Sequence, residues 1–427
     1  MSQGVIHDIR GFQIFDSRGW PSLAVEVTLD SGASALAQVP AGASTGSHEA
    51  REMRDGTAEF SGRGVTRAIN LIKEVIRPRL YGYPINQQGE LDRLLIALDG
   101  TLDKSRLGAN TILGVSLALS HAAAQWLKIP LYQYWQARTM VLPTPQFNVI
   151  NGGMHSDSGI PVQEFLLIPG GASSFAEAMR MGTEVYHALK ARLQDGGYRT
   201  AVGDEGGFAP QIREIDEVFQ LLLQSIEDAG LRPGLDLAMG IDVAANSLRE
   251  GSRYHWTSSV QLESDQLVDH YAEWLRQYPV ISLEDGLAED DWAGWAYLTQ
   301  RLGQQCQIVG DDIFVTHPKL VSRGIHDQSA NAVLIKLNQI GTVTETKEVV
   351  AMAMDAGWNT VVSHRSGETS DFSLADLAVA VGARQVKSGA PARGERLAKY
   401  NRLLLIEAHD SRLPYAGWSW RKVGADD

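Results

Sequence analysis

The clearest pattern in the sequence is a series of short apolar runs, each of which ends in a polar residue. VISLED, IVGDD and AVLIKLNQ follow one another between Val280 and Asn338. Similar runs occur before this stretch, in AMGID, and after it, in TVVSHRS and QVKSG. The six polar ends are Asp242, Glu284, Asp311, Lys336, His364 and Lys387. Continuous apolar runs of this kind are typical of strands that are buried on both faces.

The spacing of these runs predicts a barrel. Most neighbouring runs lie roughly 25 residues apart, which is enough for a strand, a loop and a return helix in a barrel of about 250 residues. The C-terminal ends of parallel barrel strands meet at one mouth, where such barrels carry out their chemistry. Any single polar end could simply cap a strand at the surface. Six of them in register favour a shared site at the barrel mouth.

The rest of the chain predicts a second, smaller domain before the barrel. Residues 5–40 alternate like a β-meander, and Gly64–Leu80 has the apolar spacing of an amphipathic helix. Further helices are expected over Leu107–Leu127, Ser174–Gln194 and Glu214–Ala229, and regular strand–helix alternation begins at Asp236. We therefore expect an α+β cap domain over residues 1–138 and a catalytic barrel over residues 139–427, giving an α/β fold class.

Composition narrows the possible partners and the compartment. A net charge of −13 and a pI near 5.3 argue against a general nucleic-acid binder, although a local cluster of cations can still hold an anionic substrate. Cys306 is the single cysteine, so no internal disulfide is possible and a buried thiol is expected. The N-terminus shows no signal-peptide pattern, and the Leu107–Leu127 segment carries several polar residues. We expect a cytoplasmic protein without a membrane segment.

Three of the strand ends carry carboxylates that favour a metal site. Asp242, Glu284 and Asp311 would repel one another at a barrel mouth unless a cation lay among them. Oxygen ligands with no histidine or cysteine cluster suit Mg²⁺ better than zinc. Asp312 is an equally acceptable ligand in place of Asp311. The sequence therefore predicts a magnesium site but leaves this choice open.

The other strand ends carry cations and a hydroxyl. Lys336 lies among leucine and isoleucine residues, where a lysine is costly to bury unless it is paired. Beside a divalent cation its pKa would fall and it could act as a base, whereas the simpler alternative is a lysine that extends to the strand end. Arg365 and Ser366 form a plausible phosphate clamp, with His364 and Lys387 beside them.

Many segments, in order, resemble the enolase (phosphopyruvate hydratase) family along essentially the whole chain. They are FDSRG, GASTGSHEA, GANTILGVSLA, NVINGGMH, VQEFLLIP, VGDEGGFAP, SLEDGLAEDDW, IVGDDIFVT, LIKLNQIGT, VSHRSGET and SGAPARGERLAKYN. The resemblance implies an N-terminal α+β cap followed by a modified TIM-type barrel, ββαα(βα)6. It also implies reversible dehydration of 2-phosphoglycerate to phosphoenolpyruvate with two Mg²⁺ ions, in a homodimer or homo-octamer.

The resemblance also assigns expected roles to individual residues. Lys336 matches the base that removes the C2 proton, and Glu205 matches the general acid, with Glu164 as its partner carboxylate and His155 as a loop histidine near the phosphate. The expected metal ligands are Asp242, Glu284, Asp311 and, for the second ion, Ser44. The expected substrate contacts are Gln163, His364, Arg365, Ser366 and Lys387.

Some positions depart from the family pattern. DSRGNPT is here DSRGWPS, the first serine of PSGAST is Ala41, and the loop after His155 reads HSDSGIP. These changes leave the matched catalytic positions intact but keep a second hypothesis open: a paralogue in specialised metabolism, such as a carboxyphosphonoenolpyruvate synthase that acts on a related phospho-acid. A non-catalytic binding protein on the same scaffold is a third hypothesis, which the retained base and metal ligands disfavour.

Overall fold

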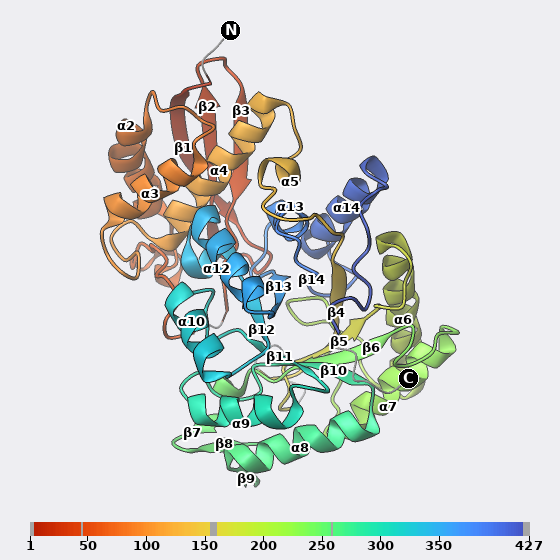
Figure 1. The fold of residues 1–427 in the computed structure, drawn as a ribbon. Helices are drawn as coiled ribbons and strands as arrows, with labels where there is room; N and C mark the ends of the chain where they lie inside the picture. The colour runs from red at the N-terminus through yellow and green to blue at the C-terminus, as the bar shows by residue number, and fades with distance from the viewer. Residues whose placement is uncertain (1–3, 44–45, 154–159, 258, 422–427) are drawn as a thin grey trace.

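The structure is a computed structural model that describes residues 4–43, 46–153, 160–257 and 259–421. Figure 1 shows a small sheet with helices at the top, in red to orange, and a barrel with surrounding helices below it, in yellow to blue. Within the described residues, eight strands close the barrel in the order β10-β11-β12-β13-β14-β4-β5-β6. The expected cap-and-barrel architecture is therefore present.

The N-terminal part begins with an antiparallel meander, as the alternating pattern predicts. Its strands are β1 (Ile6–Phe15), β2 (Pro21–Leu29) and β3 (Ser34–Gln38), and its later helices are α3 (Gln88–Asp99), α4 (Ala109–Leu127) and α5 (Leu131–Tyr134). The long helix α4 packs closely against the sheet at Gly114. A Cβ at Gly114 would lie only 2.6 Å from Val25 Cγ2, so this position requires glycine.

The helix expected over Gly64–Leu80 is interrupted. The structure has α1 (Thr66–Leu71), a π-helical turn over Ile72–Ile76 and α2 (Arg77–Leu80). Pro78 has no N–H to donate, and its ring would clash with the carbonyl of the residue four positions earlier. A wider turn before the proline relieves that clash, and the N–H of Arg77 accordingly bonds to the Ile72 carbonyl.

The barrel strands and the helices around them follow the expected alternation. The strands are β4 (Thr144–Asn151), β5 (Glu164–Ile168), β6 (Ala238–Asp242), β10 (Val280–Glu284), β11 (Gln307–Gly310), β12 (Ala332–Ile335), β13 (Asn359–Ser363) and β14 (Gln385–Lys387). The helices are α6 (Phe175–Asp195), α7 (Ile215–Asp228), α8 (Ser264–Gln277), α9 (Trp292–Leu302), α10 (Pro318–Asp327), α11 (Leu337–Ile340), α12 (Val343–Asp355), α13 (Ser373–Ala380) and α14 (Gly394–His409). A small side sheet consists of β7 (Arg249–Glu250), β8 (Arg253–His255) and β9 (Gln261–Leu262).

The barrel departs from the regular type in its first strands. Strand β5 is antiparallel to both β4 and β6, and the two helices α6 and α7 follow it before β6 begins. From β6 onward the barrel strands are parallel, and each is followed by a helix on the outside. This order is the ββαα(βα)6 arrangement that the family resemblance implies. Figure 1 shows these outer helices surrounding the barrel.

The two parts meet where the cap covers the C-terminal ends of the barrel strands. The Asp92 carboxylate of α3 accepts hydrogen bonds from both the N–H and the hydroxyl of Thr344, in the first turn of α12. The N–H of Ala50 bonds to the carbonyl of Gln339 at 2.9 Å, directly beyond the end of β12. These contacts hold the segment after residue 45 against the barrel mouth.

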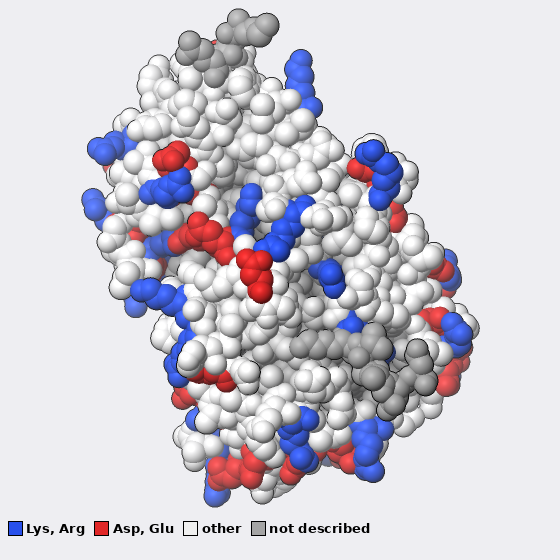
Figure 2. Space-filling view, in the orientation of Figure 1, with Lys and Arg blue, Asp and Glu red and all other residues white. Residues whose placement is uncertain are grey.

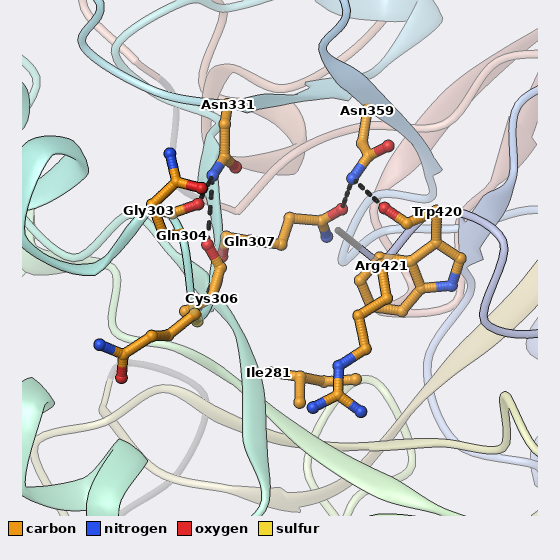
Figure 3. Close-up of a pocket in the computed structure, with 10 residues that line it drawn as sticks. Ile281, Gly303, Gln304, Cys306, Gln307, Asn331, Asn359, Trp420 and Arg421 are labelled. Atoms are coloured by element: carbon orange, nitrogen blue, oxygen red, sulfur yellow. Dashed lines mark hydrogen bonds between the residues drawn. The ribbon is translucent and has the colours of Figure 1, made fainter. Parts of the chain in front are cut away.

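The C-terminal tail closes the opposite end of the barrel, a role that its sequence did not reveal. Trp420 is only 3% exposed and packs against Ala238 and Ile281, near the N-terminal ends of β6 and β10, and against Ile168, at the C-terminal end of the antiparallel strand β5. Figure 3 shows Asn359 donating hydrogen bonds to the Gln307 side chain at 2.8 Å and to the Trp420 carbonyl at 3.0 Å. The tail is therefore part of the barrel core.

Replacing Trp420 by alanine is expected to lower the free energy of unfolding by about 3–5 kcal/mol, because a buried indole is removed and a cavity remains. Chemical denaturation followed by circular dichroism measures the change. Leu405→Ala is the matched control, since Leu405 is 52% exposed and its truncation is expected to change stability by less than about 0.5 kcal/mol. Equal effects of the two substitutions would contradict the role of Trp420.

The remaining surface and the single thiol add little chemistry. Basic and acidic side chains are mixed over the face shown in Figure 2, and several gather along the boundary between the cap and the barrel. In the described parts of the chain, no helix is long and apolar enough to cross a membrane. Cys306 is buried, as expected, and burial raises the pKa of its thiol.

Candidate active site

The polar strand ends do converge on one pocket at the barrel mouth. Asp242, Glu284 and Lys387 are the last residues of β6, β10 and β14, while Asp311, Lys336 and His364 directly follow β11, β12 and β13. The pocket is lined by Gln163, Glu164, Glu205, Asp242, Ala244, Asp285, Asp311, Asp312, Lys336, Ser363, His364, Arg365, Ser366 and Lys387. Glu284 is not one of these lining residues, but it forms an ion pair with Lys387, which is. The strand periodicity alone was therefore sufficient to locate the site.

Lys387 is the centre of the acidic side of the pocket. Its Nζ lies 3.0 Å from Glu164 Oε2, 3.0 Å from Asp242 Oδ2 and 2.9 Å from Glu284 Oε1. Burial lowers the pKa of Lys387, but Asp242, Glu164 and Glu284 outweigh it and hold the pKa well above the usual value. Burial, followed by the charge of Asp242, raises the pKa of Glu284 well above its usual value.

Lys336 pairs with the third carboxylate, Asp311, through a short ion pair. Burial lowers the pKa of Lys336, but the charge and hydrogen bond of Asp311 together with the charge of Glu284 outweigh it, and the net pKa is above the usual value. Burial likewise raises the pKa of Asp311, while Lys336 lowers it to below the usual value. The fall in the lysine pKa that we expect beside a bound cation stays a prediction, because the charges that act on Lys336 in this structure are those of protein side chains.

Asp285 belongs to this site although sequence analysis did not single it out. Its carboxylate accepts hydrogen bonds from the N–H groups of Asp311 at 2.8 Å and Asp312 at 3.1 Å. Carboxylate oxygens of these three residues lie within 4.8 Å of one another. Burial, followed by the charge of Asp312, raises the pKa of Asp285 well above its usual value. The only signal in the sequence was the Glu-Asp pair at the end of β10.

The donor set fits a magnesium ion. Asp242, Glu284 and Asp311 are all buried and contribute only oxygen atoms from three different strand ends. Among the described residues, Glu284 Oε2 is buried without a hydrogen-bond partner, and such an atom is costly unless a cation or water meets it. Asp312 instead accepts a hydrogen bond from Asn246 at 2.9 Å, and burial followed by the charge of Asp311 raises its pKa to about 7.

A histidine and a second glutamate, Glu205, lie beside Glu164 in the same pocket. His364 Nε2 lies 3.2 Å from Glu205 Oε2, and the same oxygen accepts a hydrogen bond from Asn148 Nδ2 at 3.1 Å. Burial lowers the pKa of His364 to about 4, although the charge of Glu205 acts in the other direction. Burial, followed by the charge of Glu205, raises the pKa of the neighbouring Glu164 well above its usual value. His364 is therefore neutral at physiological pH.

The depressed pKa of His364 predicts a loss of stability in acid. As pH falls from about 6.5 toward about 4, the unfolded chain takes up a proton at this position that the folded protein does not. This group therefore contributes stability above pH 6.5 that is lost on acidification, up to about 3 kcal/mol. Denaturation of wild type and His364→Gln at several pH values measures the difference, and parallel stability curves would contradict the prediction.

Arg365, the expected phosphate ligand, is held by a residue from the cap. Its guanidinium donates to Glu49 Oε2 at 3.0 Å, Glu49 Oε1 at 3.2 Å and Asn338 Oδ1 at 2.9 Å. Gln339 connects the same carboxylate to Asp311, one of the expected metal ligands, since its Nε2 donates to Glu49 at 3.3 Å and to Asp311 at 2.9 Å. Sequence analysis missed Glu49, whose role arises only when the cap meets the barrel.

Two of the remaining expected residues lie in the pocket and two cannot be placed. Gln163 and Ser366 line the pocket and are buried. The N–H of Gln163 bonds to the carbonyl of Asp242 at 3.0 Å, which holds Gln163 next to this expected metal ligand. Ser44 and His155 lie outside the described residues, so their expected roles stay predictions.

Comparison with known proteins agrees along the whole chain. Residues 6–135 match the family model described as the enolase N-terminal domain, and residues 139–423 match the model described as the enolase C-terminal TIM barrel domain. The chain belongs to the enolase family. An enolase from Acidothermus cellulolyticus is 51% identical over 415 residues, which is 97% of this chain and 96% of that relative. The expectation of an enolase with a cap domain and a TIM-type barrel is thereby confirmed.

The departures from the enolase pattern cluster where the cap loop leaves the small sheet. Arg18 donates to the carbonyls of Ala41 at 3.2 Å and Gly42 at 3.0 Å, and the Arg63 guanidinium lies 4.3 Å from the centre of the Trp20 ring. Ala41 pairs with Gly367 through two backbone hydrogen bonds. Trp20 and Ala41 thus support the base of the cap loop, whereas the altered loop after His155 lies largely outside the described residues.

Proposed function

We propose that this enolase-family protein catalyses the reversible dehydration of 2-phosphoglycerate to phosphoenolpyruvate, with Mg²⁺ as cofactor. The observation that carries the proposal is that Lys336 and Glu205 line one pocket together with Asp242 and Asp311, carboxylates from two of the strand ends. A base and an acid on the same pocket suit removal of a proton from one carbon and departure of a hydroxyl from the next. The 51% identical enolase supports the same reaction.

Lys336 is proposed as the base. Its Nζ would take the C2 proton of 2-phosphoglycerate, which leaves a second negative charge beside the substrate carboxylate. Asp242, Glu284 and Asp311 would hold one Mg²⁺ and Ser44 would contribute to a second, and these cations would supply the positive charge that such a dianion requires. The buried surroundings of Lys336 strengthen every charge interaction that the reaction uses.

Glu205 is proposed as the acid that assists departure of the C3 hydroxyl. His364 Nε2 and Asn148 Nδ2 both contact its Oε2 and hold that oxygen in place. Glu164 is the partner carboxylate, and because burial and Glu205 raise its pKa, the pair keeps one proton close to the leaving hydroxyl. His155 is proposed to act from its loop beside the phosphate.

The substrate anion is proposed to meet the cationic side of the pocket. Arg365 and Ser366 would bind the phosphate, since a guanidinium and a hydroxyl together match phosphate oxygens. Gln163, His364 and Lys387 would contact the rest of the substrate. Because Glu49 occupies two donors of Arg365, the phosphate would share the guanidinium with Glu49 or displace it.

Assembly and location are also proposals. We infer a homodimer or homo-octamer of two-domain subunits, divided at residues 138 and 139, that works in glycolysis in the cytoplasm. The exposed side chains of Phe12 on β1 and Leu36 on β3, 43% and 47% exposed, support an association surface on the small sheet. We propose no nucleic-acid or membrane partner, in keeping with the net charge of −13.

The deciding experiment supplies purified protein with 2-phosphoglycerate and Mg²⁺ and follows phosphoenolpyruvate by ultraviolet absorbance. Turnover that stops on addition of a chelator supports the proposal. A folded protein that binds Mg²⁺ and a phospho-acid without turning over 2-phosphoglycerate would overturn it. That outcome would favour the specialised paralogue, for which the altered base of the cap loop at Trp20 and Ala41 is the motivating observation.

A further inference from the structure

Arg396, in the first turn of α14, connects three parts of the active site. Its side chain is 0% exposed, and its guanidinium meets four acceptors. NH1 lies 2.6 Å from His364 Nδ1 and donates to the Arg365 carbonyl at 2.7 Å. NH2 donates to the Ser366 carbonyl at 2.6 Å and to the Asp204 carbonyl at 3.0 Å. One side chain thus holds both the loop that carries Glu205 and the loop after β13.

The surrounding backbone is built to receive this side chain. A Cβ at Gly389 would lie 2.6 Å from the Glu205 carbonyl and 2.9 Å from Arg396 Cδ, so the chain after β14 must be glycine where it passes between them. The N–H of Ala390 bonds to the Glu205 carbonyl at 2.9 Å. Arg393, directly before α14, donates to the Gly203 carbonyl at 2.9 Å. The start of α14 therefore acts as one support for the Glu205 loop.

The contact with His364 has a chemical consequence. A guanidinium carries only donors and stays protonated in proteins, so His364 Nδ1 must be the acceptor in this pair. The single proton of the neutral ring then lies on Nε2, which faces Glu205 Oε2 at 3.2 Å. With the proton on Nδ1 instead, the Nδ1–H would point at the N–H groups of Arg396, and Nε2 would have no proton to donate to Glu205. The position of Arg396 thus selects which nitrogen of His364 carries the proton.

We propose that Arg396 is a positioning residue that fixes the Nε2–H tautomer of His364 and ties the Glu205 loop to the Arg365–Ser366 loop. The inference rests on the proposed function, because it assigns Arg396 to the support of the acid and of the phosphate ligands. Lys399, on the same helix, shows what a purely structural cation looks like in this region. It binds the Glu368 side chain and the Thr369 carbonyl, which lie on the far side of the Arg365–Ser366 segment in the sequence from His364.

The first test is the tautomer of His364 in the unmodified protein. Nitrogen NMR of ¹⁵N-histidine-labelled wild type, with the His364 signals assigned by their loss in His364→Gln, identifies the protonated nitrogen. Protonation at Nε2 is the expected result. Protonation at Nδ1 would overturn the proposal whatever any Arg396 variant does, and the measurement needs neither substrate nor metal.

The second test compares Arg396→Gln and Arg396→Lys with the control Arg402→Gln. Arg402 lies further along α14, where it pairs with Asp376 at 2.6 Å and is remote from the pocket. We expect kcat on 2-phosphoglycerate to fall about 100-fold in Arg396→Gln, as for other misplaced catalytic groups, and to be unchanged in the control. Arg396→Lys supplies one charge but not four fixed donors, so it should restore little.

Chemical rescue separates positioning from general instability. Added guanidinium or methylguanidinium should raise kcat of Arg396→Ala, because the small cation can enter the vacated position, and should not affect Arg402→Ala. Full kcat in folded Arg396→Gln, with the His364 tautomer unchanged, would overturn the proposal. If wild type itself does not turn over 2-phosphoglycerate, the proposed function fails, while the NMR result still decides the role of Arg396.

Discussion

Lys336→Ala is expected to reduce kcat for 2-phosphoglycerate about 10⁴-fold, at the upper end of what one general base contributes. The substitution removes the amine proposed to take the C2 proton. Among the described residues, Lys387 is the other lysine that lines the pocket, and it cannot replace Lys336 as the base because it is paired with three carboxylates. Loss of deuterium from C2-deuterated substrate measures the proton step separately from dehydration, and both should fall together.

The same substitution also removes the partner of Asp311, so stability needs its own control. Breaking a buried ion pair typically costs about 3–5 kcal/mol of unfolding free energy. Lys104→Ala is a matched control, because Lys104 is 4% exposed and its Nζ lies 2.9 Å from Glu345, at the boundary between cap and barrel. That variant should lose comparable stability and keep kcat. A folded Lys336→Ala protein with wild-type proton exchange would refute the proposed base.

The residues that sequence analysis found share one property: their position follows from the chain itself. Asp242, Glu284 and Lys387 end apolar runs, and a parallel barrel brings the ends of such runs to one mouth. The pattern of apolar runs was therefore enough to predict the pocket without any knowledge of side-chain contacts. Asp311 and Lys336 were found in the same way, although the ion pair between them depends on side-chain distances that a sequence pattern does not encode.

The residues that sequence analysis missed depend on long-range packing. Arg396 occurs in a helical stretch rich in charged residues, where an arginine on the surface is the ordinary expectation. Its burial arises because the loop after β13, the connection between α6 and α7 and the segment after β14 all contact it at the start of α14. Glu49 reaches Arg365 only through the docking of the cap. Likewise, the two tryptophans of the GWSW tail carry no periodic signal, yet Trp420 fills the far end of the barrel.

Lys387→Met is expected to be the most destabilising substitution in the pocket. Lys387 is 3% exposed and lies within 3.0 Å of three carboxylates, so methionine leaves Glu164, Asp242 and Glu284 facing one another without a cation. In chelator, the free energy of unfolding should fall by at least about 3–5 kcal/mol, the cost of one broken buried pair. Lys399→Met removes a lysine that pairs with one carboxylate, Glu368, so its loss of unfolding free energy measures the cost of breaking a single buried pair.

The response to Mg²⁺ distinguishes charge from packing in this variant. If the lost stability reflects repulsion among the three carboxylates, a cation bound to Asp242 and Glu284 should stabilise Lys387→Met more than it stabilises wild type, because only in the variant does it replace a missing positive charge. If the loss reflects the shape of the side chain, the two proteins should gain equally. Thermal unfolding at increasing Mg²⁺ concentration measures this difference. Equal gains would contradict the electrostatic role of Lys387, because methionine keeps most of the unbranched side chain and removes the ammonium group.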